Sequence, residues 1–563
     1  MRVNRRVFIA LLLSVLFIPL PAHGEQGPSK QEVLTALRKA AEFYVTKAAS
    51  QGGYHAMYGE DLSYRRSSKG GQGPTQVSAT GAATPLVGLA FLEVWEATGD
   101  RYYLEAARSA AGAMVKGQMC SGGWDYTTEL NPAKRKNYQY RTDVDCRDQA
   151  LDTRSNMTNL DNNTTQGVLR LLMRVDLALN FQDKQVHEAV LYALDSLIQA
   201  QYPNGAWPQR YEKFPDPRLF PVKRANYPDS WSRRWPGYIF YPHYTFNDDV
   251  IINMIDVMLE AARIYREPRY KASAEKAGDF IILAQMPDPQ PAWAQQYDAQ
   301  MHPAWARSCE PPAVTGRESI SVMRGLLLLY RQTGKKKYLK PIPRALDYLK
   351  CSSWLRDGKP VIARFYELRT NRPLYITKGT RIYGIRSAGH ISKKTGLPFD
   401  GYEVTYSDKS VINHYSLVTS AEPLDSIEAE YGRLLKADPA TLRRPDKLRG
   451  LTPGTSMQKP RQSKAELSEK VRAAISALDE RGAWVQQGNI GGPGLLISVR
   501  PAKDLRVLIG GKVLTLKEDE ALEVYDGTSP PGRRVIHSGT FAANLRLLGN
   551  YLFAECLSPA TAR

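Results

Sequence analysis

The amino-acid sequence predicts an all-α fold, an α/α toroid of repeated helix hairpins, followed by a small C-terminal α+β module. Pairs of segments with helical periodicity recur along the chain, and a short polar turn separates the two segments of each pair. Each pair ends in a loop with an aromatic residue, and the tryptophans of three such loops, Trp124, Trp207 and Trp293, are 83 and 86 residues apart. Helix pairs repeating at such an interval form either an open solenoid or a closed ring.

Four helix pairs are predicted in order along the chain. In the first pair, the turn Thr98-Gly99-Asp100 interrupts the periodicity and separates the two helices. The loops after the pairs carry Trp, Pro, Gln and Arg, and one side of a toroid gathers such loops around a single cleft, so the closed ring is favoured. The predicted pairs are residues 86–97 and 103–115, 165–179 and 186–200, 250–264 and 270–284, and 319–330 and 338–349.

The helix pairs lie within a predicted catalytic domain at residues 30–430. Residues 214–244, rich in Pro, Arg, Trp and Tyr, lengthen one loop without helical periodicity and could line the cleft. A polar linker at 439–464 then leads to a helix, three short β-like segments and a closing helix. Residues 440–563 are therefore expected to form the C-terminal module, which has no catalytic pattern and whose role stays open.

Residues 1–24 have the three-part pattern of a cleaved secretory signal peptide. Arg2, Arg5 and Arg6 precede an apolar run at 7–20, and Pro, Ala, His and Gly follow it. The run is too short for a membrane span, and no later stretch reaches about 18 uninterrupted apolar residues. The mature protein is therefore expected to be soluble, outside the membrane, and secreted or periplasmic.

The composition indicates a folded protein with an anionic partner. Hydrophobic residues make up 43% of the chain and charged residues 24%, which argues against a disordered or collagen-like chain. The net charge of +19 suits nucleic acid or an acidic polymer outside the cell, and export excludes the first. The five cysteines form no metal-binding pattern; a Cys120–Cys146 disulfide and buried free thiols are both open.

Two oxygen-rich clusters precede helices in neighbouring repeats. The first contains Asp161 and Asn162, and the second contains Asp248 and Asp249. A helix N-cap accounts for some of these side chains but not for the surplus of carboxylates and amides. In a ring the two clusters would face each other, and oxygen ligands without nearby His or Cys favour a hard cation, most naturally Ca²⁺.

Two further patches are rich in arginine. Arg307 follows Pro303-Ala304-Trp305-Ala306, and an ion pair with Glu310 is an alternative to a role in chemistry. Several arginines on one wall could grip a polyuronate through bidentate carboxylate pairs, although a solvated basic face is equally open. The candidates in the second patch are Arg364, Arg372, Lys378 and Arg381.

Six motifs together resemble polysaccharide lyase family 10, the pectic acid lyases, in an ordered match over roughly residues 30–390. The resemblance implies an α/α toroid that cleaves polygalacturonate by Ca²⁺-dependent β-elimination, giving 4,5-unsaturated oligogalacturonates. The loop at 214–244 looks longer than the family pattern. The motifs are Asp161-Asn162 with Thr164-Thr165, Tyr202-Pro203-Asn204-Gly205-Ala206-Trp207-Pro208-Gln209, Tyr244-Thr245-Phe246-Asn247-Asp248, Pro303-Ala304-Trp305-Ala306-Arg307, Gly316-Arg317-Glu318-Ser319 and Arg364-Phe365-Tyr366-Glu367-Leu368.

The same resemblance implies roles for single residues. The base would be Arg307, with Arg324 in the following helix as the alternative; because a guanidinium is normally protonated, a cation-crowded site would have to lower its pKa. Asp161, Asn162 and Asp248 would hold Ca²⁺, which with arginine would stabilise the charge that develops on the substrate carboxylate. The residues expected to bind substrate are Arg364, Arg372, Lys378, Arg381, Trp207 and Trp305, with Lys378 and Arg381 as alternatives for one role.

Two other functions compete with the lyase. A toroid glycoside hydrolase, or another uronate lyase, could use Asp161 with Asp248 or Asp249. A hydrolase would not need Ca²⁺ in that role and would leave no double bond in its product. A non-catalytic polysaccharide-binding protein would use the same aromatic and arginine residues and would show affinity without turnover. Endo or exo action, tolerance of methyl esters, chain-length preference and oligomeric state cannot be read from the sequence.

Overall fold

A computed structural model describes most of the chain. The described residues are 27–67, 70–71, 73–151, 153–233, 235–237, 239–307, 309–378, 402–408, 418–442, 464–488, 497–499, 505–509, 512–516, 522–524 and 533–555. The predicted signal peptide at 1–24 lies outside them. No helix in the described part of the chain is both long and apolar enough to cross a membrane.

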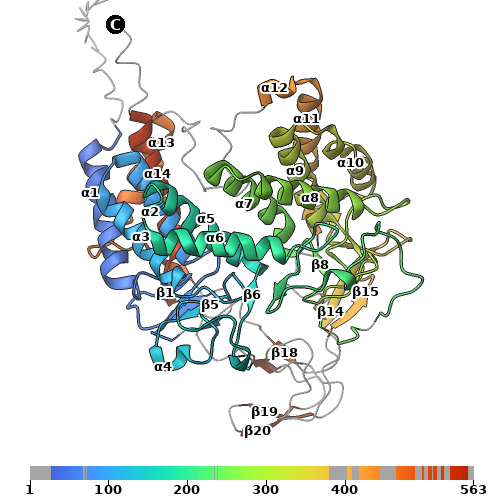
Figure 1. Cartoon of the computed structure of the whole chain (residues 1–563), viewed down its shortest axis with the longest axis horizontal. Coiled ribbons are helices and arrows are strands. Elements are labelled where there is room, and N and C mark those ends of the chain that lie inside the picture. The colour runs from blue at the N-terminus through green and yellow to red at the C-terminus, as the bar shows by residue number, and fades with distance from the viewer. Residues whose placement is uncertain are drawn as a thin grey trace, which may run out of the picture.

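All four predicted helix pairs are present (Figure 1). The first helices of the pairs, α2, α5, α7 and α9, pack side by side, and α3, α6 and α8 pack outside them. The pairs are α2 (Thr84–Thr98) with α3 (Arg101–Val115), α5 (Thr164–Ala178) with α6 (Lys184–Gln199), α7 (Val250–Tyr265) with α8 (Pro268–Leu283), and α9 (Gly316–Thr333) with α10 (Ile342–Cys351).

Local sequence explains where these helices begin and end. Asp100 caps α3 by accepting from the backbone nitrogen of Tyr102 at 2.9 Å, and Asp183 caps α6 in the same way. Gly99 and Gly334 end α2 and α9 with φ angles of 71° and 67°, a left-handed conformation that glycine adopts without strain. The turns between paired helices are therefore fixed by the residues that interrupted the periodicity.

One buried tryptophan anchors the loop at the end of each of the first three repeats. Trp124, Trp207 and Trp293 are fully buried. Their Nε1 atoms donate to backbone oxygens in the last turns of α3, α6 and α8 at 2.7, 2.8 and 2.8 Å. The regular spacing of these tryptophans thus reflects a repeated structural role.

Short antiparallel ladders gather the loops at one end of the helix pairs. Each ladder joins the residues before the first helix of a pair to the loop after its second helix. The repeat therefore brings loops distant in sequence to the N-terminal ends of the inner helices. The ladders are β4 (Gln76–Ser78) with β5 (Thr127–Glu129), β6 (Thr158–Asn159) with β7 (Arg210–Tyr211), β8 (Tyr244–Thr245) with β9 (Gln296–Tyr297), and β10 (Val314–Thr315) with β13 (Phe365–Tyr366).

The C-terminal segment shares its core with the N-terminal helices. Helix α14 (Ser538–Glu555) packs against α2, α13 (Lys464–Ser476) and α1 (Lys30–Phe43). Its apolar side chains belong to the same buried cluster as those of α2. Strand β22 (Arg533–His537) lies between β1 (Met57–Gly59) and β17 (Val485–Gly488) in one sheet. The predicted boundary near residue 440 therefore does not separate two cores.

The inner helices follow one another in an arc from α14 through α2, α5, α7 and α9 to α11 (Figure 1). Closure of this arc into a ring stays a prediction. The other helices are α4 (Pro132–Arg135), α11 (Glu422–Lys436) and α12 (Pro439–Leu442), with shorter helical turns at Tyr44–Ala48, Gln149–Leu151, Pro217–Leu219 and Lys336–Tyr338. The remaining strands are β2 (Arg65–Ser67), β3 (Gly70–Gly71), β11 (Trp354–Arg356), β12 (Lys359–Ala363), β14 (Pro373–Lys378), β15 (Tyr402–Thr405), β16 (Val418–Ser420), β18 (Ile497–Val499), β19 (Leu505–Ile509), β20 (Lys512–Leu516) and β21 (Leu522–Val524).

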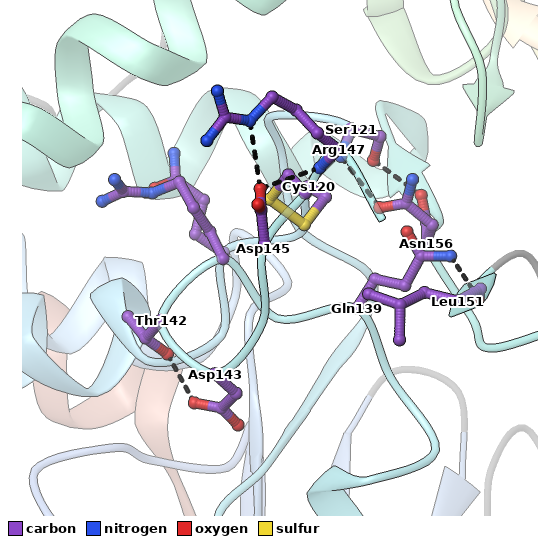
Figure 2. The surroundings of a disulfide bond; sticks show 12 residues. Cys120, Ser121, Gln139, Thr142, Asp143, Asp145, Arg147, Leu151 and Asn156 are labelled. Atoms are coloured by element: carbon purple, nitrogen blue, oxygen red, sulfur yellow. Dashed lines mark hydrogen bonds and ion pairs between the residues drawn. A yellow bond between two sulfur atoms is a disulfide. The ribbon is translucent and has the colours of Figure 1, made fainter. Parts of the chain in front are cut away.

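Cys120 and Cys146 form a disulfide, one of the two possibilities open in the sequence (Figure 2). The bond closes the loop between α3 and α5, and the Tyr192 hydroxyl of α6 donates to the Cys120 oxygen at 2.6 Å. Ser121 and Asn156 hydrogen-bond beside it. The loop after the first repeat is thus fixed to the second.

Candidate active site

Two equivalent turns face each other at the loop end of the helix arc. The turn η3 (Asp161–Asn163) precedes α5, η5 (Asn247–Asp249) precedes α7, and the two turns are in contact. Each ends with two left-handed residues, a conformation that Asn and Asp tolerate better than most residues. The side chain of Asn163 does not cap α5, and that of Asp249 does not cap α7. The simple N-cap interpretation of these clusters is therefore not what the structure shows.

Asp161 is fully buried and is the centre of a hydrogen-bond cluster. Its carboxylate accepts from the Tyr126 hydroxyl, from Gln209 Nε2 at 3.3 Å and from Arg210 Nη2 at 3.4 Å. Arg307 Nη2 donates to the same carboxylate at 3.1 Å. The chain thus brings side chains from three repeats to one carboxylate.

Asp248 lies within hydrogen-bonding reach of Asp161. Burial raises the pKa of Asp248 well above its usual range, and the neighbouring Asp161 raises it further. The charges of Arg307 and Arg317 act in the opposite direction. Two carboxylates pressed together in this way favour a shared proton or a bound cation.

Arg307 contacts two carboxylates. Beyond Asp161, its Nη1 donates to Glu310 Oε1 at 3.3 Å, and its backbone nitrogen donates to Glu310 Oε2 at 2.9 Å. The ion pair with Glu310 therefore exists beside the contact with Asp161. Asp161 and Glu310 are both acidic, and Arg210 donates to the same Asp161 oxygen as Arg307.

Arg324 lies on the exposed surface of α9 and acts on a different acid. Burial raises the pKa of Asp249, whereas a hydrogen bond from Ser321 and the charges of Arg317 and Arg324 act in the opposite direction. Among the contacts found in the described residues, none joins Arg324 to Asp161. The two candidate bases are thus separate: Arg307 belongs to the Asp161 cluster and Arg324 does not.

Arg364 is buried behind the second turn. Its Nη2 donates to Glu318 Oε1 at 3.2 Å and to Gln295 Oε1 at 3.3 Å. Gln295 in turn donates to Asn247 Oδ1 at 3.2 Å. With 4% of its side chain exposed, Arg364 supports the turn that carries Asp248.

The two tryptophans expected to bind substrate are both buried. Trp207 is one of the three repeat anchors and leaves no ring face for a sugar. Trp305 is 3% exposed, and its Nε1 donates to the Ser232 oxygen at 2.8 Å. The structure thus places both rings in packing roles.

The three basic residues expected further along the chain are placed differently. Arg372 is exposed and lies over the ring of Tyr406, with 3.6 Å between Cζ and the ring centroid. Lys378 ends β14, where it pairs with Tyr402; its side chain is outside the description. Arg381 lies outside the described residues.

Sequence reasoning missed three partners of Asp161, namely Tyr126, Gln209 and Arg210. A signal was present: Tyr126 and Gln209 each stand two residues after an anchoring tryptophan, as does Gln295, which contacts the other turn. Arg210 pairs with Asn159 in the ladder, two residues from Asp161. The side chain two residues after each of these tryptophans thus contacts one of the two turns, η3 or η5.

The residues expected to hold Ca²⁺ form a small donor set. Asn162 Nδ2 lies 3.3 Å from Asp161 Oδ2, so Asp161, Asn162 and Asp248 are neighbours. Within the described ranges, no group of three or more His, Cys, Asp or Glu side chains is placed to hold a metal. Two carboxylates that repel each other nevertheless fit a hard divalent cation, whose other ligands would be water and substrate oxygens.

A family model described as pectic acid lyase matches residues 129–337. This match confirms the resemblance carried by the motifs and supports a polysaccharide lyase. No curated protein matches the chain in sequence.

Three solved structures show the range of structural likeness. A mutant family 10 polysaccharide lyase from Cellvibrio cellulosa in complex with trigalacturonic acid is 18% identical, with a TM-score of 0.38, covering 62% of this chain and 98% of that chain. The family 10 lyase from the same organism is 21% identical, with a TM-score of 0.34, over 50% and 84% of the two chains. A family 76 mannosidase from Bacteroides thetaiotaomicron is 10% identical, with a TM-score of 0.38, over 94% and 98%.

Proposed function

We propose that the protein is an exported pectate lyase, which cleaves polygalacturonate by Ca²⁺-assisted β-elimination with an arginine base and releases 4,5-unsaturated oligogalacturonates. The observation that carries this proposal is the contact between Asp161 and Asp248 beside Arg307. The match to the pectic acid lyase model supports the substrate class.

The reaction demands positive charge at the substrate carboxylate. Removing the proton from C5 of a uronate places extra negative charge on the adjacent carboxylate, and fixed cations stabilise that charge. Arg210 and Arg317 lie near the two aspartates as such cations, and Arg307 would become a cation when it takes the proton. Asp161, Asn162 and Asp248 would hold Ca²⁺, which when bound would neutralise the substrate carboxylate as a Lewis acid.

Arg307 can accept a proton only if its present partners change. Asp161 and Glu310 both favour the protonated guanidinium, because opposite charges stabilise each other at these distances. If Asp161 held a metal ion, the charge of its carboxylate would be partly neutralised and would stabilise the protonated guanidinium of Arg307 less. The proposal therefore makes the base competent only in the calcium-loaded protein.

The same geometry disfavours a glycoside hydrolase that uses Asp161 with Asp248. Paired catalytic carboxyl groups must be roughly 5 to 9.5 Å apart to hold a glycosidic bond or a water between them. Asp161 and Asp248 are within hydrogen-bonding reach of each other, and Asp161 is already occupied by several donors. This pair therefore suits cation binding better than acid–base catalysis.

The test of the proposed function follows the ultraviolet absorbance of unsaturated products from polygalacturonate. Absorbance should rise with Ca²⁺ and stop when a chelator is added, and fresh Ca²⁺ should restore it. New reducing ends without absorbance would establish a hydrolase instead. Binding of polygalacturonate without any product would establish a binding protein.

Calcium affinity should increase with pH. Because the pKa of Asp248 is raised, a proton occupies the pair at pH values where an ordinary aspartate is ionised, and this proton must leave before the cation binds. The Kd for Ca²⁺, measured by calorimetry, should fall by up to about tenfold per pH unit as the pH rises from the ordinary pKa of an aspartate to the raised pKa of Asp248. Asp248→Asn should bind weakly and with little pH dependence. A wild-type Kd that does not change with pH would contradict the shared-proton interpretation.

A further inference from the structure

A strip of alternating aromatic rings and guanidinium groups lies beside the candidate active site. It consists of Trp231, Arg233, Tyr406 and Arg372, and we call it the stacked strip. Arg233 Cζ lies 4.5 Å from the ring centroid of Trp231 and 5.4 Å from that of Tyr406. Arg372 Cζ lies 3.6 Å from the Tyr406 centroid.

Arg233, Arg372 and Tyr406 of the stacked strip are exposed, whereas Trp231 is partly buried, and the strip retains positive charge. Arg233 is 46% exposed and Tyr406 is 41% exposed. The buried Glu367 accepts from Arg233 and from the Tyr406 hydroxyl, so it fixes their geometry and neutralises one charge. Among the ion pairs found in the described residues, none involves Arg372. One arginine of the strip is therefore available to an external anion.

The strip is continuous with the segment that carries Arg307. Trp235, from the same loop as Trp231, donates through Nε1 to the Ala306 oxygen at 2.8 Å. Trp305 donates to the Ser232 oxygen, also at 2.8 Å. Trp231 also packs on the small core that contains Cys309. The loop between β7 and β8 is thus joined to the chain on both sides of Arg307.

We propose that the stacked strip is an additional subsite for the polyuronate chain, which binds sugar units away from the point of cleavage. This inference rests on the proposed lyase function and extends it to the length of substrate that the protein prefers. Guanidinium groups pair bidentately with carboxylates, and the rings on which Arg233 and Arg372 stack hold these groups in place. A polyuronate presents a carboxylate in every unit. A nucleic acid could also bind such a strip, but continuity with the Arg307 segment favours the substrate of that site.

The experiment compares a long and a short substrate. Arg372→Ala is the chosen variant, because it removes an exposed charge without leaving a buried partner unpaired. Its KM for polygalacturonate should rise by about fivefold, the upper end of what is expected for one lost solvent-exposed ion pair, and its KM for the galacturonate trimer should rise less. Arg218→Ala is the matched control, since Arg218 lies in the same loop and its charge is already paired with Asp216.

The outcomes separate this inference from the proposed function. Equal changes in KM for the two substrates, or no change, would overturn the subsite while leaving the lyase intact. If the wild type forms no unsaturated product, the lyase proposal fails, and direct titration of polygalacturonate then tests the strip by itself. Weaker polymer binding by Arg372→Ala than by Arg218→Ala would support the subsite. Tighter binding of single-stranded DNA than of polygalacturonate to the wild type would overturn it.

Discussion

Replacing Arg307 by alanine is expected to lower kcat on polygalacturonate by at least about 100-fold, the smallest effect typical of losing a general base. The two candidate bases are Arg307 and Arg324, and within the described residues only Arg307 is found in contact with Asp161. Its loss would remove both the proton acceptor and a cation beside the reacting carboxylate. Initial rates of absorbance increase at saturating Ca²⁺ measure the effect.

Arg324→Ala is the matched comparison for this prediction. Arg324 is the other candidate base, and its charge acts on Asp249 rather than on Asp161. Its replacement should reduce activity far less than Arg307→Ala does. The reverse order, with Arg307→Ala active and Arg324→Ala inactive, would move the base to Arg324. Equal melting temperatures of the two variants would exclude unfolding as the cause.

Replacing Asp256 by alanine is expected to lower the free energy of unfolding by about 3–5 kcal/mol, the range for breaking a buried ion pair. Arg170 of α5 is 1% exposed and donates to Asp256 of α7 at 2.9 Å. The same guanidinium donates to Asn163 Oδ1 at 2.9 Å, so it also holds the turn that carries Asp161. Without Asp256 a buried positive charge would lose its carboxylate partner.

Chemical denaturation measures this loss, and two controls define its cause. Glu105→Ala removes exposed ion pairs with Arg101 and Arg108 and should change the free energy of unfolding by less than about 1 kcal/mol. Replacing Arg170 and Asp256 together by methionine and leucine should cost less than Asp256→Ala, because no charge is then left buried. If Asp256→Ala is as stable as Glu105→Ala, the pair contributes nothing to the packing of α5 on α7.

The helix pairs could be predicted from the sequence because their apolar periodicity and polar turns are local signals. The pairing of Asp161 with Asp248 was also within reach, since both precede the first helix of a repeat. The partners of Asp161 could not be predicted in this way, because Tyr126 and Arg210 lie on loops that are distant in sequence and meet Asp161 only in the folded chain. The regular spacing of Trp207 is compatible with a repeat anchor and with a ring that stacks on a sugar. Its complete burial in the structure identifies it as an anchor.

The C-terminal segment contains a copy of the tryptophan motif that ends the helix pairs. Gly482-Ala483-Trp484 repeats Gly205-Ala206-Trp207, and Trp484 Nε1 donates to the Ala474 oxygen at 2.7 Å, as the other anchors do to their helices. The polar stretch before α13 suggested a separate module. In the structure, α14 instead packs against α2 and α13 packs against α14, so both helices extend the row at its α2 end.

The most direct test of the account is the ratio of double bonds to new reducing ends in polygalacturonate treated with the calcium-loaded protein. Elimination forms one double bond for each glycosidic bond broken, whereas hydrolysis forms none. The account predicts a ratio of one for the wild type and no product of either kind in the presence of a chelator. Reducing ends that appear without double bonds, or that appear despite the chelator, would contradict it.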